Sequence, residues 1–165
     1  MNSTATQGIS LPDRQLASLA RQLQAIFIGS ISAIAANVIF YLLATELLGI
    51  PMVALEQYPP PELGLIPATD VVIFSVIFSF GASLVFLIVA NISRRPAQVY
   101  LAISLVVLIF SLFLPFRMPR PPVPMSTPVV LASMHVLGAA VLVPILIVVG
   151  LPSKGKDQLE TKQIT

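Results

Sequence analysis

Residues 25–49 read AIFIGSISAIAANVIFYLLATELLG, and this stretch decides the fold. It carries one charged residue, Glu46, and it is longer than the roughly 20 apolar residues that a helix needs to cross a bilayer. An amphipathic helix of a soluble bundle would show a polar stripe at the helical period, and this stretch has no charged stripe. A secretory signal peptide has an apolar core of only about 7–15 residues. The stretch therefore predicts a retained membrane span, to which we assign residues 23–49.

Three further apolar runs follow, at residues 71–92, 97–114 and 129–151. The chain has 165 residues, of which 56% are hydrophobic and 10% are charged, whereas about 25% of the residues in a soluble domain are charged. Of its charged residues, only Glu46 lies inside one of the four runs. Composition and placement together predict an all-α integral membrane protein, a four-helix bundle with its transmembrane domain at residues 23–151.

The positions of lysine and arginine predict the orientation, because cytoplasmic loops carry an excess of both. Most of them fall in the N-terminal tail, in the loop after the second run and in the C-terminal tail: Arg14, Arg21, Arg94, Arg95, Lys154, Lys156 and Lys162. The remaining two, Arg117 and Arg120, lie between the third and fourth runs. We therefore expect a multi-pass protein of the cell membrane with both termini in the cytoplasm.

The two tails are expected to lie outside the bilayer. Residues 1–22 form a predicted cytoplasmic tail in which Leu16, Leu19 and Leu23 share one helical face. This pattern fits a short interfacial helix, and it fits an extension of the first span into the cytoplasm equally well. Residues 152–165 are small and polar, and we expect a disordered cytoplasmic tail there.

Three polar residues inside the runs form a candidate intramembrane site, because polar groups in a membrane usually face the bundle interior. His135 lies about 10 Å from the outer end of the fourth run, and Tyr41 about 12 Å from the outer end of the first. Asn37 lies one turn deeper than Tyr41. Two interpretations stay open, because a membrane histidine can relay protons, bind a ligand or sense pH, or can be a neutral ring with one hydrogen bond. Serines at every fourth position of the second run are expected to serve helix packing.

A second candidate site lies at the outer face, where Glu46, Asp70, Arg117 and Arg120 gather. Ion pairs between the outer loops would join them, although solvated surface groups explain the same residues. Asp70 begins the second run and is predicted to cap its helix. A membrane enzyme that acts on lipid through Glu46 and Asp70 is a weaker hypothesis.

Several classes of function are disfavoured by what the sequence lacks. The chain has no cysteine and one histidine, so we predict no metal site and no cofactor. No phosphate-binding loop and no hydrolase motif is present, and we predict that the protein is not an enzyme. No basic stripe interleaved with aromatic residues is present, so we expect no nucleic-acid partner.

The order of several short features resembles a bacterial family of small four-span membrane proteins of unknown function. These features are a first span rich in small residues, the turn Arg94-Arg95-Pro96, Ser111 leading to Pro115, and Met134-His135 followed by Pro144. The likeness covers about residues 23–150, without the proline-rich loop at 115–128. The resemblance implies the four-span architecture and draws attention to His135, and it implies no catalytic residue.

The favoured function is a non-enzymatic membrane component, with the lipid bilayer around it, that associates with itself or with a larger membrane-protein partner. Its small-residue helix faces would make these contacts. The alternative is a small-molecule, ion or proton carrier or sensor that uses His135 together with Tyr41 and Asn37.

Overall fold

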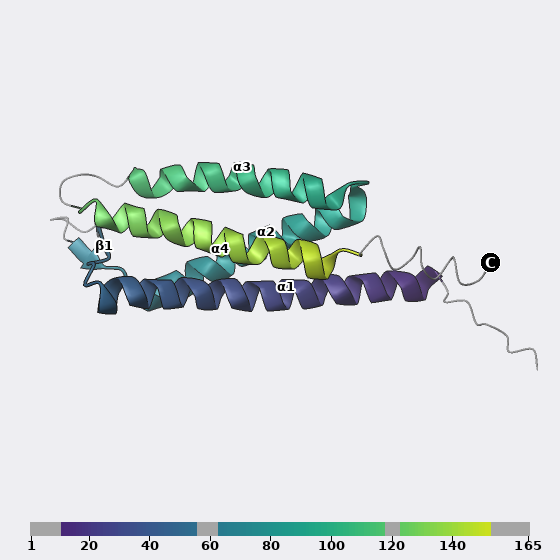
Figure 1. Ribbon diagram of the computed structural model, residues 1–165, viewed down its shortest axis with the longest axis horizontal. Helices are drawn as coiled ribbons and strands as arrows, with labels where there is room; N and C mark the ends of the chain where they lie inside the picture. The colour runs from purple at the N-terminus through teal and green to yellow at the C-terminus, as the bar shows by residue number, and fades with distance from the viewer. Residues whose placement is uncertain (1–10, 56–62, 118–122, 153–165) are drawn as a thin grey trace, which may run out of the picture.

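A computed structural model describes residues 11–55, 63–117 and 123–152 of the chain. Four α-helices make up most of it: α1 (Leu11–Leu42), α2 (Ala68–Ile92), α3 (Pro96–Phe116) and α4 (Ser126–Gly150) (Figure 1). A short π-helix, η1 (Leu43–Leu47), continues α1. All four helices are long and apolar enough to cross a membrane. The predicted architecture of a four-helix, multi-pass membrane protein is thereby confirmed.

Helix α1 is longer than the first apolar run. It begins at Leu11 and continues without a break to Leu42, so residues 11–22 belong to the same helix as the span. Whether residues 11–22 lie along the membrane surface or extend from it stays a prediction. In Figure 1 the start of α1 projects beyond the other helices at one end of the bundle.

The bundle has two distinct ends, for which we use two names. The terminal end holds the start of α1, the turn at residues 93–95 between α2 and α3, and the end of α4 (Figure 1). The hairpin end holds strands β1 (Val53–Leu55) and β2 (Leu63–Leu65), which pair antiparallel, with Val53 opposite Leu65. The hairpin is an addition to the predicted all-α fold. The sequence does not predict it, because strands of three residues are too short to show an alternating pattern and the prolines around them indicate only loops.

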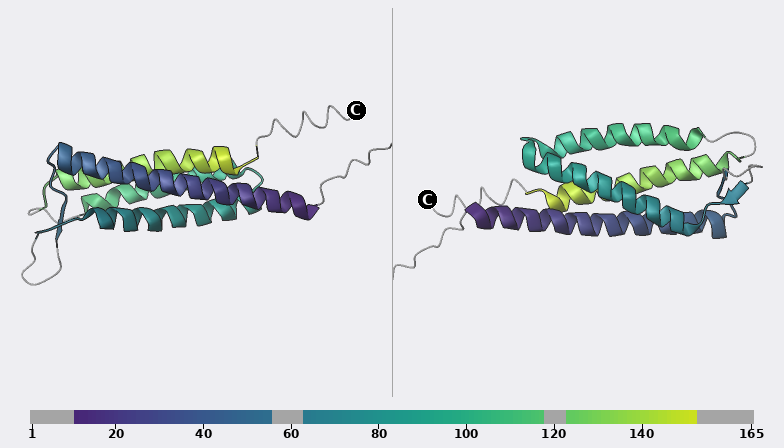
Figure 2. Two further views of the ribbon diagram at one scale, coloured as in Figure 1. Left: turned by 90° about the horizontal axis from the view of Figure 1, so that it is seen from below. Right: turned by 180° about the vertical axis from the view of Figure 1, so that it is seen from behind.

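Helix α1 packs along α4 and α2, and α3 lies on the other side of α4 from α1 (Figures 1 and 2). Helix α2 runs obliquely, from α1 at the hairpin end to α3 at the terminal end (Figure 2). Gly29 and Ala33, a pair of small residues at helical spacing, are buried in α1. A Cβ atom at Gly29 would lie 3.0 Å from Leu142, so this face lets α1 and α4 approach closely.

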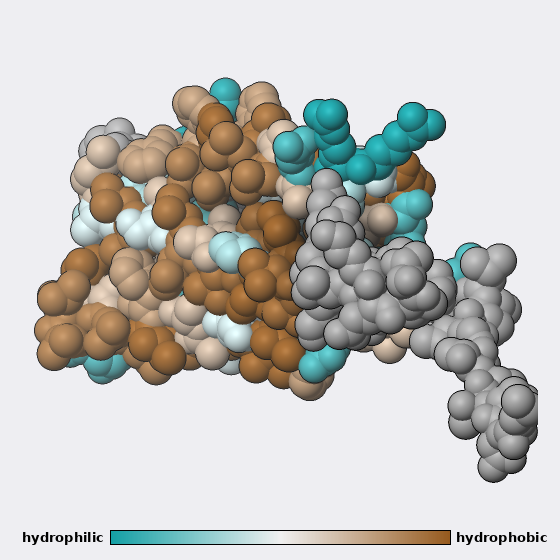
Figure 3. Space-filling model, turned by 45° about the vertical axis from the view of Figure 1, so that its right-hand side comes forward, coloured by the Kyte–Doolittle hydropathy of each residue, from teal (hydrophilic) through white to brown (hydrophobic). Residues whose placement is uncertain are grey.

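Two apolar clusters fill the interior, one in each half of the bundle. The cluster toward the terminal end is centred on Phe86, Tyr100 and Leu146, and the cluster toward the hairpin end contains Met52 and Met134. Large apolar side chains are exposed on all four helices, and brown predominates over the described part of the face in Figure 3. Such a surface suits acyl chains, which are as apolar as leucine.

Candidate functional site

Asn37 is the polar group at the junction of three helices. Its Nδ2 atom, on α1, donates a hydrogen bond of 3.1 Å to the hydroxyl of Ser75 on α2. A Cβ atom at Gly138 of α4 would lie 3.2 Å from the same nitrogen, so glycine leaves room for the amide there. The Oδ1 atom of Asn37 is buried and has no hydrogen-bond partner. Asn37 therefore links α1 to α2 and packs against α4, with one acceptor unused.

Tyr41 lies one turn further along α1 and holds the hairpin end together. Its hydroxyl donates a hydrogen bond of 2.6 Å to the backbone carbonyl of Ile66, between β2 and α2. On the other side of the hairpin, the buried Thr127 hydroxyl donates a hydrogen bond of 3.1 Å to the carbonyl of Pro51. Both bonds satisfy carbonyls of irregular backbone, which are costly to leave unpaired near a membrane.

His135 is half-buried on α4 and makes its polar contact within its own helix. Its Nδ1 atom lies 2.7 Å from the carbonyl oxygen of Leu131, one turn earlier. Because a carbonyl can only accept, Nδ1 carries a proton and donates it. The ring also meets Phe78 of α2 edge-on, with ring centroids 5.6 Å apart.

The structure thus brings the three predicted residues into one region without joining them. Gly138, against which Asn37 packs, lies one turn from His135 on α4. No hydrogen bond connects Asn37, Tyr41 and His135, all of which lie in the described part of the chain. Each of the three is instead used to position or pack a helix or loop.

Two cavities in the described residues are open at the surface, and neither contains the candidate residues. The first, of about 570 Å³, lies between α3 and α4. The second, of about 480 Å³, lies between α2 and α3 next to the turn at the terminal end. Apolar side chains line both almost entirely. They resemble sites for acyl chains or apolar side chains more than sites for a polar substrate.

Three of the four predicted outer-face residues, Glu46, Asp70 and Arg117, lie in the described part of the chain. Glu46 is exposed on η1, and both it and Asp70 lie within electrostatic range of the Tyr41 hydroxyl. Arg117 is exposed at the end of α3, and Arg120 lies outside the described residues. No ion pair forms between Glu46, Asp70 and Arg117 in the described ranges.

The predicted capping role of Asp70 is wrong. Pro67 occupies the N-cap of α2, and Asp70 lies in the first turn, where its backbone nitrogen donates to the carbonyl of Pro67. Its carboxylate makes no capping hydrogen bond, although it lies at the positive end of the helix dipole. The proline, which cannot donate a backbone hydrogen bond, starts the helix one turn before the carboxylate.

One polar contact between α1 and α2 was not predicted from the sequence. Asn91 of α2 donates hydrogen bonds to the side chain of Gln22 (3.3 Å) and to the carbonyl of Leu87 (2.7 Å). Gln22 is 3% exposed, although it lies in the segment expected to be a tail. Its spacing from Ala25 and Gly29 places it on the buried face of α1. From this spacing, the burial of Gln22 could have been predicted.

The described residues contain no group of three or more histidine, cysteine, aspartate or glutamate side chains that could hold a metal ion.

Comparison of the sequence with known protein families gives a match over most of the chain. Residues 17–149 match a family of unknown function, DUF6069. No curated protein and no solved structure matches the chain.

Proposed function

We propose that this chain, which belongs to the DUF6069 family of unknown function, is a non-enzymatic component of the cell membrane. It associates with itself, or with a larger membrane protein, through an exposed face of α2. Both its termini lie in the cytoplasm, as the distribution of lysine and arginine indicates. The family has no described activity, so the proposal rests on the surface of the protomer.

Gly81 is the observation that carries the proposal. It lies in the middle of α2, exposed, and apart from its chain neighbours and the backbone of its own helix no atom lies within 4 Å of the position that a Cβ would take. By contrast, a Cβ at Gly29, Gly138 or Gly150 would meet a neighbouring side chain of the same protomer. A glycine inside a helix costs about 0.5–1 kcal/mol relative to alanine. Packing within the protomer offers no reason for this cost, whereas close approach of another helix does.

The residues around Gly81 have the pattern of a helix-packing seam. Phe74, Ile77, Gly81 and Leu84 are spaced alternately by three and four residues, which keeps them on one face of α2. The three large side chains are each at least half exposed. We call these four residues the α2 seam. Glycine makes a notch in it, into which a side chain of a facing helix fits.

The alternative, a carrier or sensor based on His135, has weaker support. It draws on the unpartnered Oδ1 atom of Asn37, a residue that packs against Gly138, one turn from His135 on α4. Such a role requires a water-accessible cavity at the ring. The ring packs against Phe78 instead, and neither of the two described cavities reaches it.

Cysteine cross-linking in native membranes tests the proposal, because the chain has no cysteine of its own. Leu84→Cys places a thiol on the α2 seam. Ile39→Cys places one on the exposed face of α1 as a matched control, because both residues are at least half exposed. With a short bifunctional thiol reagent, we expect Leu84→Cys to yield a product of twice the 17.6 kDa protomer mass, and Ile39→Cys to stay monomeric.

A second substitution shows whether the notch is responsible. Gly81→Leu added to Leu84→Cys fills the notch and should abolish the cross-linked product. Ala35→Leu, on the exposed face of α1, should leave the product unchanged. Equal cross-linking at Leu84 and Ile39 contradicts the proposal. A product of another mass identifies a larger partner in place of a second copy.

A further inference from the structure

The cavity between α2 and α3 begins at the turn that joins the two helices and follows α2 as a groove. Ser93, at the turn between the two helices, lines its mouth, and Val85, Ile92, Val99 and Ile103 line its walls. From Ser93 to Val85 the groove follows α2 for ~12 Å, at 1.5 Å per residue. One leaflet of the hydrocarbon core is about 15 Å thick, half of the whole. With the turn at the membrane surface, the groove would occupy most of one leaflet and stop near the bilayer centre.

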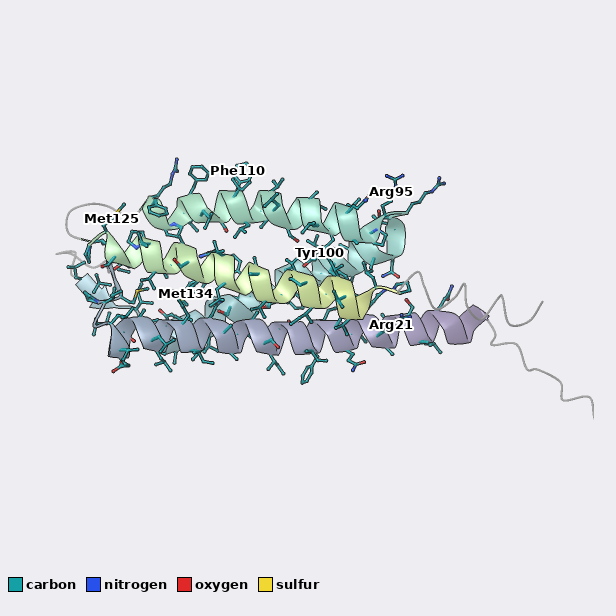
Figure 4. The ribbon with its side chains drawn as sticks, viewed as in Figure 1. Arg21, Arg95, Tyr100, Phe110, Met125 and Met134 are labelled. Carbon is teal, nitrogen blue, oxygen red and sulfur yellow. The ribbon has the colours of Figure 1, made fainter. Side chains whose placement is uncertain are left out.

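Two arginines stand at the mouth of this groove. Arg94 and Arg95 directly follow Ser93 in the turn, and both are exposed. Figure 4 shows Arg95 at the terminal end, where hydrophilic side chains also gather in Figure 3. Neither arginine forms an ion pair with any described residue. Guanidinium groups bind phosphate oxygens in a bidentate way, and basic pockets between membrane helices hold anionic head groups.

We propose that this groove and the two arginines form a binding site for an anionic glycerophospholipid. One acyl chain lies in the groove between α2 and α3, and the phosphate contacts Arg94 and Arg95. The depth of the groove favours a lipid over a helix of another protein, because a membrane-spanning helix would need a contact surface through both leaflets. The paired positive charges favour an anionic lipid over a zwitterionic one, whose own ammonium group competes for the phosphate.

Native mass spectrometry of the full-length protein tests the site. The protein is purified in a mild detergent and mixed with equal amounts of phosphatidylglycerol and phosphatidylcholine. We expect the wild-type chain to retain phosphatidylglycerol preferentially. Arg94→Gln and Arg95→Gln should each lower its retention about fivefold, the factor that corresponds to about 1 kcal/mol per basic residue near an anionic surface. Arg117→Gln, a single exposed arginine at the hairpin end, is the matched control and should change nothing.

A second pair of variants tests the groove itself. Val99→Phe fills it, whereas Val107→Phe makes the same change at an exposed position of α3 outside it. We expect Val99→Phe to reduce the retention of both lipids, and Val107→Phe to leave it unchanged.

Three outcomes would overturn the proposal. A loss of retention in Arg117→Gln equal to that of the two turn arginines would mean general charge attraction. Equal effects of Val99→Phe and Val107→Phe would mean lipid that is bound all around the protein. If Val99→Phe abolishes the cross-linked product of Leu84→Cys but leaves lipid binding intact, the groove is a protein interface. If Val99→Phe fails to fold, the three arginine variants still decide the question, because they change only exposed side chains.

Discussion

Gly150 and Gly81 are both glycines in membrane helices, and their surroundings differ sharply. A Cβ at Gly150 would lie 2.6 Å from the ring of Phe86, which is itself packed edge-on against Tyr100. A Cβ at Gly81 would meet nothing within 4 Å beyond its chain neighbours and the backbone of its own helix. We therefore expect the same substitution to have different consequences at these two positions of one chain.

We predict that Gly150→Ala lowers the free energy of unfolding by about 1–3 kcal/mol, because the added methyl overpacks a ring that has little room to move. Gly81→Ala should leave it unchanged or raise it by up to about 1 kcal/mol, through the better helix propensity of alanine. Thermal unfolding in detergent, followed by the circular dichroism of the helices, measures both. Equal destabilisation by the two variants contradicts the packing described for Phe86.

At the same scale, the candidate residues could be located from the sequence more easily than their contacts. Counting residues from the span ends places Asn37, Tyr41 and His135 at similar depths, and the structure brings them into one region. The partner of Asn37 depends on how α1 and α2 are rotated and shifted relative to each other, and a single sequence does not specify this. His135 donates its hydrogen bond to a carbonyl of its own helix. This contact depends on the side-chain rotamer, which residue spacing does not predict.

At the scale of elements, the β1–β2 hairpin is held by side chains that come from two helices. Tyr41 of α1 binds one flank of the hairpin and Thr127 of α4 the other. The amide of Ile66 completes the arrangement by donating to the carbonyl of Met52. The hairpin should therefore open locally before the helices separate.

We predict that Tyr41→Phe speeds hydrogen exchange at the Ile66 amide about fivefold, because a lost hydrogen bond of this kind is worth about 1 kcal/mol. The exchange of amides within the four helices should not change. Tyr100→Phe is the matched control, since its hydroxyl contacts the carbonyl of Ala82 in the other cluster of the bundle, at 3.4 Å. Faster exchange throughout the molecule in Tyr41→Phe would mean that Tyr41 supports the whole bundle.

The four helices were predictable because each needs a long apolar run, which is a strong signal. Their ends were less so. Helix α1 continues to Leu11 through polar residues, although residues 15–20 are mostly exposed and burial begins only at Gln22. Helix α3 continues through Pro115 to Phe116, although proline usually indicates the end of a helix. The hairpin gave no signal, since its strands are three residues long.

At the scale of the whole molecule, the two ends of the bundle differ in charge. The turn with Arg94 and Arg95 lies at the terminal end, and Arg21 lies near the same end on α1 (Figure 4). The described part of the hairpin end carries Glu46, Asp70 and Arg117. Because the translocation of arginine and lysine is disfavoured, this asymmetry favours the terminal end in the cytoplasm.

Single cysteines at the two ends test this orientation. Ser93→Cys lies in the turn at the terminal end and Ser126→Cys at the start of α4, in a chain that has no other thiol. In intact cells, a membrane-impermeant thiol reagent should label Ser126→Cys and should reach Ser93→Cys only after the membrane is permeabilised. The reverse pattern would place the termini outside, and the arginines of the turn would then face the outer leaflet. Labelling of both residues in intact cells would mean that the chain inserts in two orientations. The excess of basic residues at one end would then be too small to fix a single topology.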